Sequence, residues 1–501
     1  MSTHLAKRTT RGFLYMFGQT LASKVVSLVG QLVLAYLLAP AAFGLFATAM
    51  AITALTAVIQ EIGLREILIR KRRAFNRWAS SAVWLSLTLG AVAGTALLVA
   101  SPFLADLKGD PRLLPMLVVL AASIPFWGGA LPFAAAIERD LRFTLSANAQ
   151  FGFATLLIVL QVILAWMGMG PLAFVLPRLI VGVVRFMTLW KLSGVRVRPR
   201  PELRLWRFFA RDGIPLTFST LLDIVVRQAD YLILGFFAND AVVGFYFFAY
   251  NQSTQVAQLL MLNLTRVLLP SLSTLSHDAV RQVRAFLKAI SVLALVCTPL
   301  CVLQGALAGP VLRLLYQDRW ADSIPLLQIL SVALAIAIVG WPSASLLLAQ
   351  GRYKTKLLLS AIGAACFVAF VTLGSWLGGA VGTALGVMAY RVTLDPIRLY
   401  VATRPGSVHF IRVVPVFMTP LTGSILTIGA GWLAAEQIPD SILQHAWLVE
   451  VVRIAATCAV GLPLYLLWAR FVSASEWREL MARLRTAAPA RFADRIPAWL
   501  D

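Results

Sequence analysis

Long apolar runs recur along the whole of this 501-residue chain, separated by short polar segments that are rich in basic residues. A run of about 20 apolar residues in a helix is long enough to cross a hydrocarbon core of about 30 Å. The runs show no alternation with a period of two, so helices are expected rather than barrel strands. The pattern predicts an all-α, polytopic membrane protein with about 14 transmembrane helices, drawn at approximately 13–37, 43–64, 79–103, 113–137, 147–167, 172–190, 213–237, 241–264, 286–308, 324–349, 357–376, 381–400, 413–434 and 447–469.

The composition agrees with an apolar solvent. Apolar residues make up 59% of the chain and charged residues only 13%, whereas a soluble domain carries about 25% charged residues. The N-terminal 24 residues have a basic start followed by an apolar run, as a signal peptide does. That run is too long and ends in no convincing cleavage site, so it is interpreted as the first span.

The distribution of basic residues predicts the orientation. The formal net charge is +22, which taken alone also suits nucleic acid. With the N-terminus in the cytoplasm, however, 34 of the 44 Lys and Arg residues fall in cytoplasmic segments and five within spans. The five on the opposite side are Lys108, Arg112, Arg313, Arg319 and Arg453. This asymmetry predicts that both termini are cytoplasmic and that the basic loops meet anionic lipid headgroups rather than nucleic acid.

The chain resembles itself. Residues 32–50, "LVLAYLLAPAAFGLFATAM", align with residues 232–250, "LILGFFANDAVVGFYFFAY", which places Gly44 on Gly244. Residues 131–143 align with 341–353, and "WMGMG" at 166–170 aligns with "WLGGA" at 376–380. Each repeat unit holds six spans, an even number, so both copies enter the membrane from the same side. A parallel repeat with a pseudo-two-fold axis along the membrane normal is expected.

The repeat predicts the domain organisation. Residues 1–190 form an N-terminal six-helix lobe, and residues 213–400 form a C-terminal one. Between them, residues 191–212 form a basic cytoplasmic linker with an amphipathic helix. Two additional transmembrane helices follow at 401–470, and a cytoplasmic amphipathic tail at 471–501.

No pattern in the sequence predicts a metal or a cofactor. The four cysteines all fall within predicted spans, the four histidines are scattered through loops and ends, and no metal-ligand spacing occurs. A phosphate-binding loop of the nucleotide-hydrolysing kind is also missing from the sequence.

Two motifs in the first two spans resemble a known family, the Wzx-type polysaccharide flippases of the multidrug/oligosaccharidyl-lipid/polysaccharide exporter superfamily. They are a Pro-x-x-Phe-Gly turn and an acidic-x-Gly-Leu element before a basic loop, at Pro40, Phe43, Gly44, Glu61, Gly63 and Leu64. The segment "ADYLILGFFANDAVVGFY" is similar to the start of that family's second lobe. The resemblance covers roughly residues 12 to 400.

The resemblance implies a carrier in a bacterial inner membrane that moves an undecaprenyl-diphosphate-linked oligosaccharide from the cytoplasmic to the periplasmic leaflet. It also implies two six-helix bundles that alternate between inward-open and outward-open states around a cavity with cationic residues. The expected partners are the lipid-linked oligosaccharide, membrane lipids, and a polysaccharide polymerase with its co-polymerase. We expect a monomer.

Three charged residues in the seventh span are candidates for the cavity. Asp223, Arg227 and Asp230 are spaced four and three apart, so they share one helical face. Charges at mid-membrane cost about 2.5–3.5 kcal/mol each, and they usually face a cavity or a partner. In one interpretation the aspartates only neutralise Arg227. In the other, Arg227 binds a phosphate, and Asp223 and Asp230 orient it or exchange ions.

Further basic residues lie inside spans. By the repeat offset, Lys24 lies at the membrane depth of Asp223, and the two are expected to face each other across the cavity. Arg178 and Arg185 lie two turns apart in the sixth span with no acidic residue within one turn, which favours a cavity-lining role. In the twelfth span, Arg391 and Asp395 form an i, i+4 pair.

Three other functions remain open. A lipid II flippase also has fourteen spans, and a multidrug exporter of the same superfamily would need an acidic cavity for its cationic drugs. A membrane polysaccharide polymerase or glycosyltransferase would need a sizeable outward domain for its acceptor. The longest outward segments, about 309–323 and 435–446, are too short to form one, so an enzyme is not expected.

Overall fold

A computed structural model describes residues 2–61, 63–64, 67–68, 75–140, 142–199, 201–275, 277–438, 445–474, 476–478 and 481. Every regular element in these residues is an α-helix or a short 3-10 helix. A helix satisfies its backbone hydrogen bonds within one segment, which is what an apolar run in lipid requires. The all-α prediction is confirmed.

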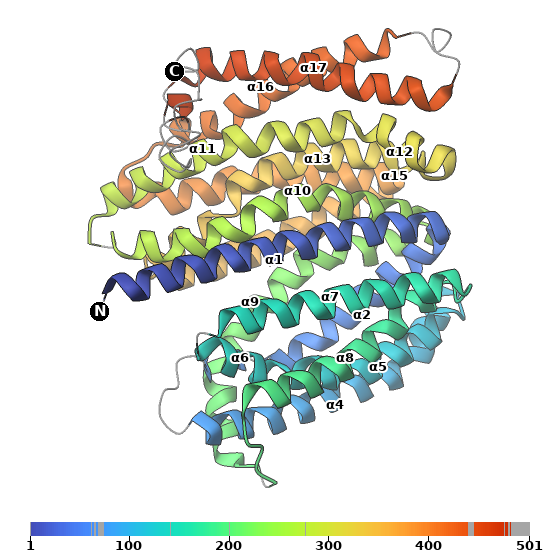
Figure 1. Cartoon of the computed structure of the whole chain (residues 1–501), viewed down its shortest axis with the longest axis vertical. Coiled ribbons are helices and arrows are strands. Elements are labelled where there is room, and N and C mark those ends of the chain that lie inside the picture. Colours follow the sequence, from blue (N-terminus) through green and yellow to red (C-terminus); the bar gives the residue numbers. More distant parts are fainter. Residues whose placement is uncertain are drawn as a thin grey trace. The chain divides into compact units, whose positions relative to one another are not determined.

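The chain divides into two compact units, Met1–Phe247 and Phe248–Asp501, called unit 1 and unit 2 here. Unit 1 contains the beginning of α10 and eight complete helices of the described residues: α1 (Ser2–Leu37), α2 (Pro40–Glu61), α4 (Phe75–Lys108), α5 (Leu113–Gly129), α6 (Leu131–Arg139), α7 (Phe143–Trp166), α8 (Leu172–Ser193) and α9 (Leu203–Phe237) (Figure 1).

Unit 2 contains the rest of α10 (Asp240–Ser273) and the helices that follow it. These are α11 (Ala279–Ala306), α12 (Ala308–Tyr316), η1 (Gln317–Trp320), α13 (Ser323–Gly340), α14 (Ser343–Ala349), α15 (Tyr353–Thr403), η2 (Arg404–Gly406), α16 (Phe410–Glu436) and α17 (Ala446–Val472). The last two pack side by side (Figure 1). Most of the predicted tail, 479–480 and 482–501, lies outside the described residues.

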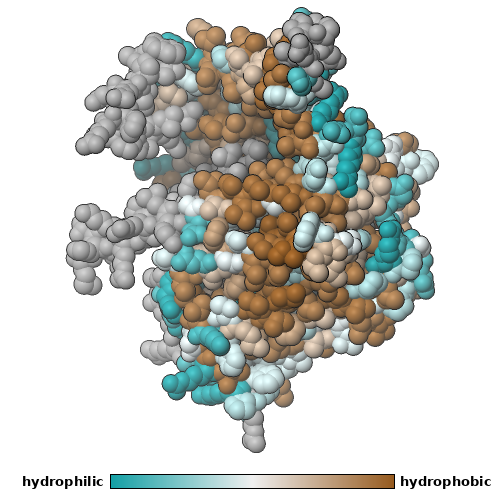
Figure 2. All heavy atoms as spheres, turned by 45° about the vertical axis from the view of Figure 1, so that its right-hand side comes forward, coloured by the Kyte–Doolittle hydropathy of each residue, from teal (hydrophilic) through white to brown (hydrophobic). Residues whose placement is uncertain are grey.

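The described helices account for the predicted spans. Ten of them are long and apolar enough to cross a membrane. The stretch Tyr353–Gly406 covers two predicted spans, because α15 breaks at Gly378 and Gly379. The predicted spans that are not among these ten helices correspond to α1, α9 and α10. Hydrophobic side chains cover much of the face drawn in Figure 2, and hydrophilic ones gather toward its margins. That distribution is typical of a surface that faces lipid.

Two turns show the repeat in the backbone. Gly168 and Gly170 join α7 to α8 with φ of +79° and +56°, and Gly379 breaks α15 with φ of +54°. A side chain is disfavoured in this left-handed region, so glycine permits both turns. They lie in the aligned segments "WMGMG" and "WLGGA".

The repeat also appears as a reciprocal contact within unit 1, called the glycine crossing here. A Cβ atom added to Gly44 would lie 1.8 Å from the carbonyl oxygen of Asp240, and one added to Gly244 would lie 1.9 Å from that of Pro40. The starts of α2 and α10 therefore touch backbone to backbone. Contacts exchanged in this way between equivalent positions are what a two-fold relation produces. The pseudo-symmetric, parallel repeat is confirmed at this point.

The linker joins unit 1 through α4. Arg77 donates from Nε to Glu202 Oε1 at 2.7 Å, and the indole of Trp206 donates to the carbonyl oxygen of Ser81 at 3.2 Å. The amphipathic segment after residue 202 continues without a break into the seventh span, as the single helix α9. Because α2 and α4 pack against α9, this helix belongs to unit 1 although the repeat assigns it to the second lobe.

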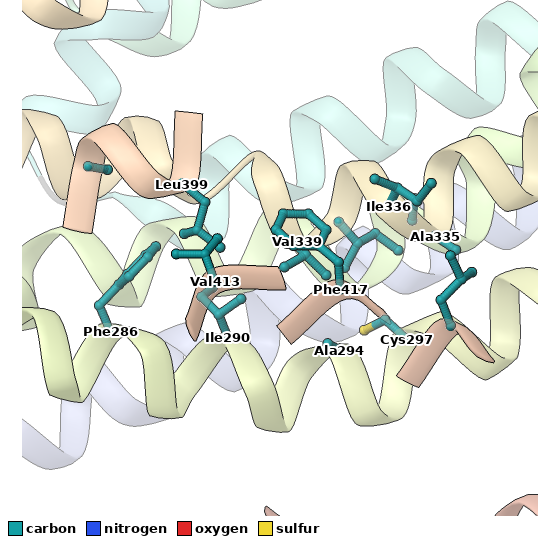
Figure 3. Close-up of a cluster of buried hydrophobic side chains, with 14 of the residues drawn as sticks. Phe286, Ile290, Ala294, Cys297, Ala335, Ile336, Val339, Leu399, Val413 and Phe417 are labelled. Carbon is teal, nitrogen blue, oxygen red and sulfur yellow. The ribbon is translucent and has the colours of Figure 1, made fainter. Parts of the chain in front are cut away.

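Unit 2 has an apolar core where α11, α13, α15 and α16 meet. Phe286 and Ile290 of α11 lie beside Val339 of α13 and Phe417 of α16 (Figure 3). A smaller cluster joins Leu295 to Tyr465, Ala469, Trp477 and Met481. Trp477 and Met481 of the amphipathic tail are thus buried in protein.

Candidate functional site

Arg178 and Arg185 of α8 meet at one aromatic ring, Trp127 of α5. Their guanidinium carbons lie 5.3 and 4.8 Å from the ring centroid, within the range of cation–π attraction. The indole nitrogen of Trp127 donates to the carbonyl oxygen of Arg178 at 3.0 Å. We call these three residues the Trp127 group. It presents two cations and an aromatic face inside unit 1.

Gly182 makes this arrangement possible. It lies between the two arginines on α8, and a Cβ atom there would be 2.8 Å from the Trp127 indole nitrogen. Only a residue without a side chain lets the ring approach the helix so closely. The sequence analysis considered charged residues within the predicted spans, so it did not select Trp127. A tryptophan in an apolar helix is usually part of the hydrophobic core.

A related arrangement occurs in unit 2, where the sequence "RVTLDPIR" at 391–398 follows the pattern of "RLIVGVVR" at 178–185. Arg391 lies over the Trp341 ring at 5.6 Å, and its Nη1 is 3.6 Å from Asp395 Oδ2. Arg398 approaches the other oxygen of Asp395 at 3.3 Å. These residues, the Trp341 group, confirm the predicted Arg391–Asp395 pair and add Arg398 to it.

The two groups differ in charge. Asp395 is fully buried between its two arginines and neutralises one of them. The position four residues after the first arginine is Gly182 in α8, and α8 contains no acidic residue at all. The Trp341 group is therefore an internally paired core element, whereas α8 leaves the charge of the Trp127 group to be balanced from elsewhere.

The three charged residues of α9 that share a helical face differ in how deeply they are buried. Asp230 is fully buried and accepts a hydrogen bond from the Tyr246 hydroxyl at 2.9 Å, whereas Asp223 and Arg227 are exposed. No ion pair joins Arg227 to either aspartate among the residues that the structure describes. Sequence reasoning missed Tyr246, whose role depends on the tight turn between α9 and α10.

Lys24 is half-buried in α1, which packs chiefly against α7. The structure brings Arg178 and Arg185 together around Trp127, and the pairing of Lys24 with Asp223 stays a prediction. The six predicted site residues all belong to unit 1.

Beside the glycine crossing, an ion cluster joins the loop after α4 to the turn between α9 and α10. Lys108 Nζ donates to the carbonyl oxygen of Gly235 at 2.6 Å and lies 3.3 Å from Asp240 Oδ1. Arg112 binds Asp110 at 2.6 Å and reaches Asp240 at 4.0 Å. The Arg112 hydrogen bonds lower the pKa of Asp110 to about 2. Lys108 and Arg112 are two of the five basic residues that the sequence places on the outward side.

The burial of the two cations predicts which of them contributes more to the stability of the protein. The Lys108 side chain is 15% exposed and that of Arg112 is 60% exposed. We expect Lys108→Met to lower the free energy of unfolding by about 2 kcal/mol, since it leaves the Gly235 carbonyl without its donor and Asp240 without its nearest cation. Arg112→Ala should cost less than about 1 kcal/mol, as exposed pairs do. Thermal unfolding of the purified variants measures both, and equal losses would contradict the assignment.

Comparison with known proteins supplies the family. The model of the family "Polysaccharide biosynthesis protein" matches residues 33–325. The lipopolysaccharide biosynthesis protein WzxC of Escherichia coli (strain K12) is 23% identical over 382 residues, which cover 76% of this chain and 78% of that protein. The succinoglycan biosynthesis transport protein ExoT of Rhizobium meliloti (strain 1021) is 23% identical over 478 residues, 92% of this chain and 93% of that protein.

Solved structures show the same fold. The lipid II flippase MurJ in an inward closed conformation superposes with a TM-score of 0.74 at 13% identity, covering 92% of this chain and 99% of that one. A mutant of the Vibrio cholerae MATE transporter VcmN superposes with a TM-score of 0.55 at 16% identity, covering 81% of this chain and 98% of that one. With a family match over more than half its length, the chain belongs to the polysaccharide biosynthesis protein family, and it shares the fold of these membrane transporters.

Proposed function

We propose that this protein moves an undecaprenyl-diphosphate-linked oligosaccharide from the cytoplasmic to the periplasmic leaflet of a bacterial inner membrane, for the assembly of an exopolysaccharide, O-antigen or capsule. Family membership and the names of WzxC and ExoT support a role in polysaccharide export. Both termini lie in the cytoplasm under this proposal, as the 34 to 5 distribution of basic residues favours.

The Trp127 group is the observation that carries the proposal. Guanidinium groups bind phosphate and carboxylate oxygens through paired hydrogen bonds, and an indole face packs against the apolar face of a sugar ring. Arg178 and Arg185 flank such a face at 5.3 and 4.8 Å. Two cations and one aromatic ring suit a ligand that combines a diphosphate or an acidic sugar with neutral sugars.

Alternating access needs no chemical energy source for such a cargo. Moving about two negative charges outward through an inside-negative potential of about 100 mV is favourable by roughly 4–5 kcal/mol. The exposed Arg227 and the half-buried Lys24 add positive charge along the path. Asp223 and Asp230 are the candidates for ion coupling, and the Tyr246 hydroxyl donates a hydrogen bond to Asp230.

A lipid II flippase is the second candidate, favoured by the fold shared with MurJ. Depletion separates the two functions: loss of a surface glycan alone supports the proposal, and arrest of peptidoglycan synthesis supports lipid II. A multidrug exporter fits less well, because two arginines would repel a cationic drug. If the purified protein in liposomes elongated a lipid-linked glycan, it would instead be a polymerase or glycosyltransferase. A polysaccharide polymerase and its co-polymerase are the expected partners of the exporter, which would act as a monomer.

Removing either arginine of the Trp127 group tests the proposal. We expect Arg178→Ala and Arg185→Ala each to reduce surface glycan by about tenfold or more, because each loses charge-assisted hydrogen bonds worth about 1.5–3 kcal/mol. Lipid-linked repeat units should accumulate in the cytoplasmic leaflet. Surface glycan and lipid-linked intermediates are measured at equal membrane abundance.

The matched control is Lys191→Ala, which removes an exposed cation from the end of the same helix and should leave export unchanged. Arg185→Lys keeps the charge and should restore part of the output. Lys24→Ala and Arg227→Ala extend the series to the other predicted cavity cations. Wild-type export from all four alanine variants would refute a cationic cavity.

A further inference from the structure

Unit 2 contains a pocket of about 540 Å³ that the transport proposal does not use. It lies where α11 begins, at Ala279, and where the chain passes from η2 into α16, at Phe410. Arg284 and Lys288 line it from α11, and Arg412 lines it from α16. We call it the basic pocket.

The pocket carries positive charge. Three basic side chains and one acidic side chain, Glu476, line it, which leaves a formal charge of +2. None of the ion pairs among the described residues uses Arg284 or Arg412. The first turn of α16 also faces this region without a side-chain cap on its amide groups. Free amides at a helix start favour a negative group nearby.

Apolar side chains with large exposed fractions lie among the lining residues or next to them in sequence. Val280 is 49% exposed, Phe410 is 43% exposed and Ile411 is 82% exposed, all within the first turns of the same two helices. A pocket for an anion next to exposed aliphatic and aromatic side chains matches a molecule with a charged head and hydrocarbon chains. A soluble anion would leave the exposed parts of these side chains uncovered.

The predicted position of the basic pocket in the membrane indicates which kind of ligand it binds. The distribution of basic residues predicts that α11 begins and α12 ends on opposite sides, with the start of α11 in the cytoplasm. Anionic phospholipids of the cytoplasmic leaflet attract basic residues at this level, and basic pockets between transmembrane helices bind their headgroups.

We propose that the basic pocket binds the headgroup of an anionic phospholipid, with the phosphate between Arg284, Lys288 and Arg412 and the acyl chains along α11 and α16. The bound lipid bridges α11 to the first of the two additional helices. It stabilises their contact, where Phe417 of α16 packs into the core beside Ile290 of α11 (Figure 3). This role is independent of the transported substrate.

Lipid binding to the purified full-length chain tests the proposal. Native mass spectrometry and thermal unfolding in detergent are recorded with added phosphatidylglycerol, with zwitterionic phosphatidylcholine, and with inorganic phosphate alone. We expect phosphatidylglycerol to bind and to raise the melting temperature, and phosphatidylcholine to do so weakly. Arg284→Gln with Arg412→Gln should weaken phosphatidylglycerol binding by about thirtyfold.

The control pair is Arg281→Gln with Lys354→Gln. Both side chains are exposed, one on the same turn of α11 and one at the start of α15, and neither lines the pocket. This variant removes the same charge and should bind phosphatidylglycerol like the wild type. Equal weakening in both double variants would overturn the site. So would a melting-temperature rise with inorganic phosphate equal to that with phosphatidylglycerol, because the ligand would then be a free anion.

Discussion

Gly44→Ala is expected to abolish export and to lower the melting temperature of the protein. The new methyl group would lie 1.8 Å from the carbonyl oxygen of Asp240, and backbone cannot move aside as the end of a side chain can. Overpacking of this kind costs about 1–3 kcal/mol. Gly244→Ala should behave alike, since its methyl group would meet the Pro40 carbonyl oxygen at 1.9 Å.

The reason for the effect on export lies in the starts of α2 and α10. The proposed carrier must close each end of its path in turn, and the starts of α2 and α10 approach this closely only because both positions are glycine. A methyl group on either one holds the helices apart. Melting of the purified variants and surface glycan at equal membrane abundance are the two measurements.

Gly152→Ala is the matched control. A Cβ atom at this position of α7 meets nothing within 4 Å, so the substitution should leave melting temperature and export unchanged or raise stability slightly. Wild-type melting and export in Gly44→Ala would show that the glycine crossing opens freely and that its close contact is dispensable.

The second large effect is expected from Asp395→Asn. Asp395 is fully buried, and its two oxygens lie 3.6 and 3.3 Å from Arg391 and Arg398. Removing its charge leaves a buried arginine cation without its partner, a change that costs about 3–5 kcal/mol. We expect the amount of folded protein in the membrane to fall sharply, measured by monodisperse yield and by thermal unfolding.

A second variant shows whether the loss of stability comes from the broken ion pair or from a local packing defect. Arg391→Met combined with Asp395→Asn removes both charges and should recover much of the stability, since well-packed neutral residues often replace a buried ion pair at little cost. The double variant should therefore melt above Asp395→Asn alone. If it melts below the single variant, the two residues act separately.

Much of the architecture follows from the order of residues alone. Apolar runs of about 20 residues leave a chain few choices other than helices in lipid, so the fourteen spans could be drawn before any coordinates. The repeat was visible because glycines at the turn after Trp166 and at the break after Trp376 have a backbone role that few other residues can fill.

The candidate site was predictable only in part. Arg178 and Arg185 stood out as charges in an apolar helix with no acidic residue within one turn, and Arg391 with Asp395 as an i, i+4 pair. Trp127 could not be chosen in the same way, because its role depends on the arginines of another helix that lie beside it. Arg398 lies three residues after Asp395 on the same helix, so its spacing could have predicted the contact. Asp230 shares a helical face with Arg227 by spacing, yet it accepts a hydrogen bond from the Tyr246 hydroxyl on the next helix.

Hydropathy and charge distribution therefore define the helices, their number and the expected orientation. Each of these depends on the polarity or charge of individual residues, which the sequence shows directly. Contacts between helices decide the rest. Gly44 meets Asp240, Gly182 admits the Trp127 ring, and Arg284 shares a pocket with Arg412, because packing places residues far apart in sequence within a few ångströms. No periodicity along the chain encodes those distances.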